Sequence, residues 1–412
     1  MRGMERQTSV YLAGVSGVRP KVPVDPAALE QAALGVLPDE AAAYISAGAG
    51  ARETMGANRA GFTDWRIVPR VLRDTSARDP GTELFGRRSP GPLLTAPIGV
   101  LELAHREADL AVARGAAAAG VPMIISNQAS TPMEEIAAEL GDSPRWFQLY
   151  WSSSDEVVES FVERAERCGC EAIVVTLDTT QLGWRPRDLD LAYLPFLRGK
   201  GIAQYTSDPA FNRLVKEDAA QAGEAPRPRP TPTAIRTLIE LTRSRASRAQ
   251  VQTFIRTYSR PSLAWENLAF LRERTKLPII LKGILHPDDA ERAIAEGMDG
   301  VLVSNHGGRQ VDGAIGAVEA LPAVAERVGG RVPVLIDSGV RGGADVFKAL
   351  ALGADAVLVG RPYVYGLALA GAEGVREVLQ NFQAEVDLTM GLTGVSSVEE
   401  IGRDALVRAP VR

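Results

Sequence analysis

The chain reads DGVLVSNHGGRQ at residues 299–310, VPVLIDSGVRGG at 332–343 and ADAVLVGRP at 354–362. Each stretch holds a short run of apolar residues that ends in small or polar ones. Unbroken apolar runs, in contrast to alternating ones, predict strands covered on both faces, as in a parallel sheet with helices outside it. Five earlier runs repeat the pattern: GPLLTAPIGV (91–100), VPMIISN (121–127), RWFQLYW (145–151), EAIVVTLD (171–178) and LPIILKG (277–283).

Helical stretches separate these runs. One of them begins at Pro287-Asp288-Asp289 and ends at Gly297, which places proline and acidic residues at a helix start and glycine at its end. About eight strands, each followed by a helix, predict an α/β fold of the (β/α)8 TIM-barrel type. A doubly wound sheet would usually carry a GxGxxG turn after its first strand, and none is present there.

Two segments lie outside the repeat. Residues 1–90 contain a helical stretch around Pro26–Gly48 and then irregular chain, and we expect them to cover one end of a barrel formed by residues 91–412. An insertion of roughly 185–262 follows the fourth strand, and its proline-rich centre, GEAPRPRPTPT (223–233), predicts no regular structure. A basic amphipathic helix is expected after it, over 234–258. A loop of this length predicts an active-site cover or a linker, and the basic helix predicts a solvated or oligomer-contacting face.

The composition is that of a globular protein with a sizeable core. The chain has 412 residues, 45% of them hydrophobic, and its formal net charge of −5 argues against a nucleic-acid partner. No stretch reaches the ~18 apolar residues of a membrane span, and the start lacks the apolar core of a signal peptide, so we expect a cytoplasmic protein without a membrane partner.

The two cysteines predict neither a disulfide nor a metal site. Cys168 and Cys170 are too close for an ordinary disulfide. They also lack the second pair of ligands that a zinc site needs, so we expect reduced thiols and no metal.

Reactive residue types gather where the predicted strands end, which is where TIM barrels carry their active sites. His306 is one of three histidines in the chain and follows an apolar strand directly, whereas His105 and His286 stand at helix starts. It is a candidate general base, and Arg309 is a candidate fork for a carboxylate. The other strand-end residues of this kind are Tyr150, Asp178, Lys282, Asp337 to Arg341, and Gly360 with Arg361.

The ends of the seventh and eighth strands predict a phosphate site. Small residues there, at 337–343 and at 360, precede helices, and helix N-termini at this place form the usual phosphate site of the fold. Arg341 and Arg361 would add positive charge. A glycine-rich turn that binds nothing is the structural alternative.

The motifs SNHGGRQ (304–310) and LIDSGVRGGADVFKALALGADAVLVGRP (335–362) resemble those of the FMN-dependent 2-hydroxy acid oxidase and dehydrogenase family. Within that family the chain is most similar to the lactate 2-monooxygenase group. The resemblance to this group lies in TLDTTQLGWRPRDLDL (176–191), LPFLRG (194–199), residues 205–209, LKGILHPDDA (281–290) and the long insertion.

The resemblance implies roles for individual residues. His306 would be the base with Asp178 as its partner, Arg185 and Arg309 would bind the substrate carboxylate, and the substrate would also contact Tyr44 and Tyr150. Lys282 would contact the flavin. Contacts to the flavin ring would come from Pro97, Ile98, Gly99, Asn127, Gln148, Thr176 and Ser304, and contacts to the phosphate from Asp337, Ser338, Gly339, Arg341, Gly360 and Arg361. Members of the family commonly carry an apolar or aromatic residue where this chain has the polar Gln128. The substrate is therefore allowed to be larger or more polar than lactate.

The implied reaction is FMN-dependent oxidation of a small L-2-hydroxy acid with O₂. If the chain acts like the lactate 2-monooxygenase group, L-lactate would yield acetate, CO₂ and water. One alternative is an oxidase that releases the 2-oxo acid and hydrogen peroxide, and another is a dehydrogenase with a different electron acceptor. An alternative of another class is a phosphate-binding TIM barrel without flavin chemistry. The resemblance also implies a homo-oligomer, either a tetramer or an octamer.

Overall fold

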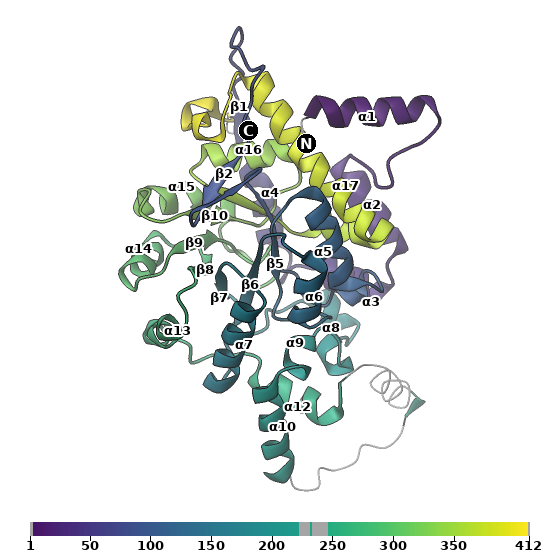
Figure 1. Cartoon of the computed structure of the whole chain (residues 1–412), viewed down its shortest axis with the longest axis vertical. Coiled ribbons are helices and arrows are strands. Elements are labelled where there is room, and N and C mark those ends of the chain that lie inside the picture. Colours follow the sequence, from purple (N-terminus) through teal and green to yellow (C-terminus); the bar gives the residue numbers. More distant parts are fainter. Residues whose placement is uncertain (1–2, 222–230, 233–245, 411–412) are drawn as a thin grey trace.

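The computed structural model describes residues 3–221, 231–232 and 246–410. Eight parallel strands in this part of the chain close into a barrel (Figure 1), which confirms the predicted TIM-barrel class. Around the barrel the strands are β4 (Leu93–Thr95), β5 (Met123–Ile125), β6 (Arg145–Tyr150), β7 (Ile173–Thr176), β8 (Ile279–Ile284), β9 (Gly300–Val303), β10 (Val334–Ile336) and β11 (Ala356–Val359), and β11 pairs with β4.

The barrel has a filled interior. Alternate strand residues such as Trp146, Ile280 and Leu302 form one buried cluster inside it, while their neighbours along the strands face the surrounding helices. A hairpin from the N-terminal segment, β2 (Thr82–Leu84) with β3 (Arg87–Ser89), closes one end by placing Phe85 5.6 Å from Trp146 between ring centroids. The barrel interior is therefore a packed core, and a ligand can bind only at the opposite end of the barrel.

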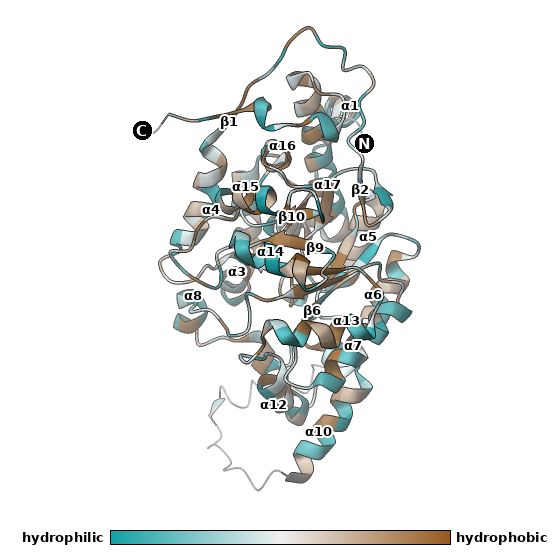
Figure 2. Cartoon of the chain, turned by 90° about the vertical axis from the view of Figure 1, so that its left-hand side faces the viewer, coloured by the Kyte–Doolittle hydropathy of each residue, from teal (hydrophilic) through white to brown (hydrophobic). Residues whose placement is uncertain are grey.

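Helices surround the strands, with apolar residues inside and polar residues outside (Figure 2). They are α5 (Ala108–Ala119), α6 (Met133–Leu140), α7 (Asp155–Arg167), α13 (Leu268–Arg274), α14 (Pro287–Ala295), α15 (Ala317–Val328), α16 (Gly343–Ala351) and α17 (Arg361–Thr393), the last interrupted by non-helical backbone at Ala370 and Gly371. Within the described ranges, no helix combines the length and apolar character that crossing a membrane requires.

The N-terminal segment is more regular than expected. It forms α1 (Gly3–Val15), α2 (Pro26–Val36), α3 (Asp39–Ser46), α4 (Glu53–Thr63) and β1 (Trp65–Ile67), which pairs with β12 (Leu406–Arg408). The expectation of irregular chain after Gly48 is wrong for α4, whose internal Gly56 and Gly61 weaken the helical signal in the sequence. The N-terminal segment also contacts both ends of the barrel, because Phe85 closes one end and α3 lies at the other. The domain division at residue 90 stays a prediction.

The insertion lies between β7 and β8, as predicted. Its described parts are α8 (Pro186–Asp190), the short turn η2 (Pro195–Arg198), α9 (Ala203–Thr206), α10 (Pro209–Gln221) and α12 (Arg248–Thr257). The proline-rich centre, apart from residues 231–232, and the first part of the expected basic helix lie outside the described residues. The described flanks form packed structure: the Tyr205 ring lies 4.9 Å from Phe161 of α7 and 4.8 Å from Phe254 of α12.

A buried ion pair joins the insertion to the barrel helices. Arg164 of α7 is 2% exposed, and its guanidinium lies 3.0 Å from the fully buried carboxylate of Asp208 at the start of α10. Glu134 of α6 accepts two more hydrogen bonds from Arg164. Two buried charges are tolerated here because each has its partner within hydrogen-bonding distance.

Removing Asp208 should therefore destabilise the protein strongly. We expect Asp208→Ala to lower the free energy of unfolding by about 3 kcal/mol, because Arg164 would lose a compensating charge in a buried site. Arg213→Ala is the matched control, since Arg213 pairs with Glu156 on the surface and its loss should cost less than ~1 kcal/mol. Urea unfolding followed by circular dichroism measures both, and equal midpoints would contradict the prediction.

Candidate active site

One cavity opens at the end of the barrel where the strands finish. The space between its lining residues, together with the open solvent at its mouth, is about 1070 Å³. Most of the predicted site residues line it: Tyr44, Pro97, Ile98, Gly99, Gln128, Tyr150, Arg185, Lys282, His306, Arg309, Asp337, Ser338, Gly339, Arg341, Gly360 and Arg361. Four predicted residues, Asn127, Gln148, Thr176 and Ser304, are buried at the strand ends, where the lining residues Gln128, Tyr150 and Lys282 also lie.

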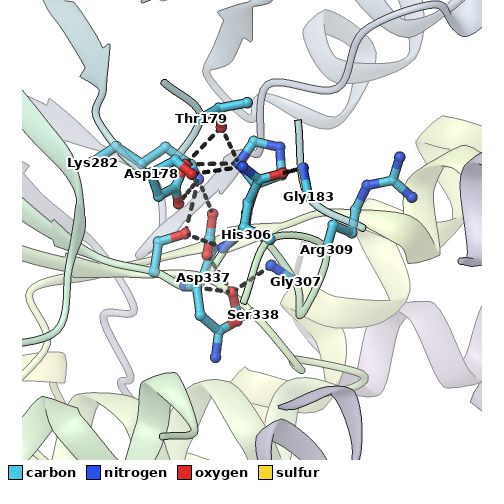
Figure 3. A network of polar contacts seen from close by, with 12 residues as sticks. Asp178, Thr179, Gly183, Lys282, His306, Gly307, Arg309, Asp337 and Ser338 are labelled. Carbon is cyan, nitrogen blue, oxygen red and sulfur yellow. Dashed lines mark hydrogen bonds and ion pairs between the residues drawn. The ribbon is translucent and has the colours of Figure 1, made fainter. Parts of the chain in front are cut away.

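His306 is held in one orientation. Its Nδ1 lies 2.9 Å from Asp178 Oδ1 and 3.1 Å from Thr179 Oγ1, so Nε2 is the ring nitrogen left for a ligand in the cavity (Figure 3). The backbone of His306 has φ +58°, a left-handed conformation that costs energy for a residue other than glycine. Hydrogen bonds from the His306 and Gly307 amides to Ser304 Oγ and Ser338 Oγ support it.

Lys282 connects two carboxylates behind His306. Its Nζ lies 3.2 Å from Asp337 Oδ2, 4.0 Å from Asp178 Oδ2 and 2.8 Å from Ser304 Oγ (Figure 3). Burial lowers the pKa of Lys282, but the two carboxylates outweigh it and raise that pKa above its ordinary value. Burial likewise opposes ionisation of Asp178, yet Lys282 and His306 bring the pKa of its carboxyl down to about 2. Asp178 is therefore a permanent anion beside the imidazole.

The pKa of His306 reflects opposing influences. Burial lowers it most, Asp178 raises it, and the charges of Lys282 and Arg185 lower it further, so that it ends below the ordinary histidine value. A neutral imidazole at pH 7 can accept a proton, and the adjacent carboxylate stabilises the cation that results. The pair has the form of a general base with an orienting anion.

Guanidinium groups crowd the same cavity. Burial, followed by repulsion from Arg185, lowers the pKa of Arg309 to about 9, and burial with repulsion from Arg341 lowers that of Arg361 to about 10. Arg361 is bonded to the carbonyls of Ile45, Gly307 and Ala47, which carry only partial charge. Uncompensated buried cations favour anionic ligands, so the cavity is suited to carboxylates and phosphates.

Two tyrosines complete the part of the cavity near Arg309. Arg309 lies over the Tyr44 ring, 5.0 Å from its centroid, and bonds to the carbonyls of Tyr44 and Ala47. Burial raises the pKa of both Tyr44 and Tyr150, so their hydroxyls stay protonated and remain hydrogen-bond donors. Since α3 carries Tyr44, the N-terminal segment contributes directly to the site.

The buried strand ends fit the ring of FMN. Asn127 Nδ2, Gln148 Nε2 and Thr176 Oγ1 are buried without a hydrogen-bond partner in the described structure. Asn127 follows β5, Gln148 lies within β6 and Thr176 ends β7. Buried polar groups of this kind are costly unless a ligand satisfies them. The flavin ring has nitrogen and oxygen atoms along one edge that would do so. Pro97 to Gly99 provide a wall beside them.

The cavity residues that follow β10 and β11 fit the phosphate. Ser338 and Gly339 have φ of +74° and +91°, and Arg341 hydrogen-bonds only to the carbonyl of Val340, at 3.0 Å, among its described side-chain contacts. Helix α17 begins directly after Gly360, so its N-terminus faces the same place. These residues would hold the phosphate, while Lys282 and the unpaired polar groups would hold the ring.

The cavity also contains residues that the sequence analysis missed. Leu182, Phe196 and Tyr258 also line it, and the ring centroids of Phe196 and Tyr258 lie 6.3 Å apart. Phe196 and Tyr258 come from opposite ends of the insertion, so only its packing brings them to the cavity. Thr179 was missed although it directly follows Asp178, a position that could have indicated it.

Comparison with known proteins agrees with this geometry. Residues 33–408 match the model of the FMN-dependent dehydrogenase family. The chain is 42% identical over 403 residues to the FMN-dependent alpha-hydroxy acid dehydrogenase qulF of Penicillium citrinum, covering 98% of this chain and 95% of that protein. It is 40% identical over 386 residues to L-lactate oxidase of Lysinibacillus sphaericus, covering 94% and 93%. A crystal structure of mandelate oxidase superposes with a TM-score of 0.76 at 37% identity, covering 94% of this chain and 99% of that one.

Fold, cavity and charges define an enzyme that uses FMN to oxidise 2-hydroxy acids. The chain belongs to the FMN-dependent dehydrogenase family. The predicted family and FMN as cofactor are confirmed, and the assignment to the lactate 2-monooxygenase group is not.

Arg341 provides a test of the phosphate site. We expect Arg341→Gln to weaken FMN binding about 10- to 100-fold, since a charge-assisted hydrogen bond contributes about 1.5–3 kcal/mol. Fluorescence titration of the apoprotein with FMN measures the dissociation constant. Arg331→Gln is the control, because Arg331 pairs with Glu291 on the surface; an equal dissociation constant for both variants would refute the assignment.

Proposed function

We propose that the protein is an L-2-hydroxy acid oxidase that releases the 2-oxo acid and hydrogen peroxide. The observation that carries the oxidation step of this proposal is the 2.9 Å contact between His306 Nδ1 and Asp178 Oδ1, which leaves Nε2 available in a cavity shared with Arg185 and Arg309. A base beside two carboxylate-binding groups is what removal of hydrogen from a 2-hydroxy acid requires.

The proposed roles follow from where the residues lie. Arg185 and Arg309 would bind the substrate carboxylate, and the Tyr44 and Tyr150 hydroxyls would donate hydrogen bonds to it. His306 Nε2 would take the hydroxyl proton as the C2–H bond breaks. Bound FMN supplies the acceptor for the two electrons that leave the substrate.

The overall reaction balances without further reagents. The hydroxy acid loses two electrons and two protons to become the 2-oxo acid, and O₂ gains the same to become hydrogen peroxide. If the 2-oxo acid instead stayed bound, peroxide formed beside it would decarboxylate it, which is the monooxygenase outcome. We prefer the oxidase because relatives at about 40% identity bear oxidase names, L-lactate oxidase and 4-hydroxymandelate oxidase among them. Relatives named dehydrogenases support the alternative of another acceptor.

The walls of the cavity favour a second substrate besides lactate. Leu182, Phe196 and Tyr258 give part of the cavity an apolar and aromatic lining, and Gln128 adds a side-chain amide. An aryl substituent would bury apolar area against these rings, whereas a methyl group would leave them exposed. An aromatic 2-hydroxy acid such as (S)-mandelate is therefore the second candidate, and the ratio of kcat/KM for (S)-mandelate and L-lactate decides between them.

The function is tested by the hydrogen peroxide formed per hydroxy acid consumed, in air, with the purified FMN-loaded protein. We expect a ratio near one, with the matching 2-oxo acid as product. His306→Ala should bind FMN and form no peroxide above background, because the base is missing. Acetate from L-lactate with little peroxide would support the monooxygenase instead, and oxidation only with an added dye acceptor would support a dehydrogenase.

Asp178 gives a pH prediction. Its charge raises the pKa of His306, so Asp178→Asn should lower that pKa and move the acid limb of kcat/KM to lower pH. The maximal rate should fall about 100-fold or more, because the protonated imidazole loses its stabilising anion, while KM changes little. Steady-state kinetics between pH 4 and 9 would measure both, and a limb that moved to higher pH would contradict this role.

A further inference from the structure

The turn Ser126–Thr131, which follows β5, connects several parts of the cavity. Its residues Asn127 and Gln128 are 0% and 8% exposed, and Gln128 lines the cavity. Asn127 Oδ1 accepts a hydrogen bond of 2.9 Å from the amide of Tyr150, and the Gln128 carbonyl accepts one of 2.9 Å from Val100, next to the wall formed by Pro97 to Gly99. A displacement of this turn would move groups on both the flavin side and the substrate side.

Gln204, on α9 of the insertion, spans both ends of this turn. Its side chain is fully buried, and its Nε2 donates to the Thr131 carbonyl at 3.2 Å, with a longer contact of 3.5 Å to the Ser126 carbonyl. Its Oε1 accepts a hydrogen bond of 2.9 Å from the amide of Met133, the first residue of α6. The neighbouring amide of Ala203 adds a backbone hydrogen bond of 3.1 Å to Ala129.

Gln204 is itself fixed. Arg164 donates a hydrogen bond of 2.8 Å to the Gln204 carbonyl, and the same guanidinium pairs with Asp208. From the barrel side, Asp109 accepts a hydrogen bond of 2.8 Å from the Ser130 amide. The turn is therefore held between α5 and the insertion, and among the described residues of the insertion Gln204 is the one whose side chain hydrogen-bonds to it.

We propose that Gln204 is a positioning residue for the reaction: through the 126–131 turn, the insertion sets the places of Asn127 and Gln128 in the active site. The inference rests on the proposed function. A buried amide with three polar contacts would be unnecessary for an insertion that merely covered the mouth, because apolar packing of Tyr205 and Phe254 already attaches it. Small displacements of substrate-positioning groups cost large factors in rate.

Gln204→Leu removes the three contacts and keeps the approximate volume. We expect KM for the hydroxy acid to rise about tenfold, a weaker FMN complex and an altered visible spectrum of the bound FMN. The matched control is Gln250→Leu on α12, which also removes glutamine hydrogen bonds from the insertion, to Ser247 and to Asn212 at 2.9 Å, but none to the turn. This variant should keep the wild-type KM and spectrum.

Gln204→Glu separates positioning from folding. The ionised carboxylate still accepts a hydrogen bond from the Met133 amide but has no proton to donate to the Thr131 carbonyl. The protonated carboxyl group can donate to that carbonyl. The defect in KM should therefore grow as pH rises, whereas the control variant should follow the wild-type pH profile. If Gln204→Leu fails to fold, the pH dependence of KM in Gln204→Glu still tests the positioning role.

Wild-type KM and FMN spectrum in both Gln204 variants would overturn the inference. If instead no variant and no wild-type protein oxidised a hydroxy acid, the proposed function would fail. The FMN dissociation constant and spectrum of the Gln204 variants, compared with those of Gln250→Leu, would then still decide the positioning role.

Discussion

The active site depends on one buried arrangement of alternating charges, Asp178–Lys282–Asp337. Asp178 and Asp337 follow β7 and β10, and Lys282 lies within β8. Each charge has an opposite neighbour within 4.0 Å. A buried ion pair of this kind does not by itself favour folding over an apolar core. Its effect is chemical: it keeps Asp178 ionised, and an ionised Asp178 orients His306 and favours its protonated form during the reaction. The left-handed backbone of His306 belongs to the same arrangement, since the strain is held by hydrogen bonds to Ser304 and Ser338.

The second constraint is a cluster of positive charges for which no ion pair with a carboxylate is found among the described residues. Arg185, Arg309, Arg341 and Arg361 line one cavity, and the lowered pKa values of Arg309 and Arg361 record the energetic cost of burying them together. A phosphate near Arg341 and a carboxylate near Arg309 would each remove part of that cost. Ligand binding and stability are therefore linked, because any ligand that binds only the folded state adds to its stability.

The sequence allowed the barrel and most of the site to be predicted because both depend on local patterns. Apolar runs identify the strands, and the ends of parallel strands must meet, so His306, Lys282 and Asp178 could be expected together before any coordinates. Phe196, Tyr258 and Gln204 could not, since they reach the cavity or its supporting turn only through the packing of the insertion. Tyr44 and Arg185 were expected only from family resemblance, and α4 was missed because its glycines hide the helical pattern.

The insertion bears most directly on what happens after oxidation. Its length predicts an active-site cover or a linker, and its described flanks form packed structure: Phe254 stacks on Tyr258 with centroids 5.0 Å apart, and Tyr205 packs on Phe161 of α7. Among the described residues of the insertion, Phe196 and Tyr258 line the cavity, and retention of a bound 2-oxo acid would depend in part on how well it fits between them. A product with a methyl group fills little of that space and has few contacts to hold it. For the proposed oxidase, a methyl-bearing 2-oxo acid would then leave faster than an aryl one, so the balance between release and decarboxylation of the product would depend on the substrate as well as on the enzyme.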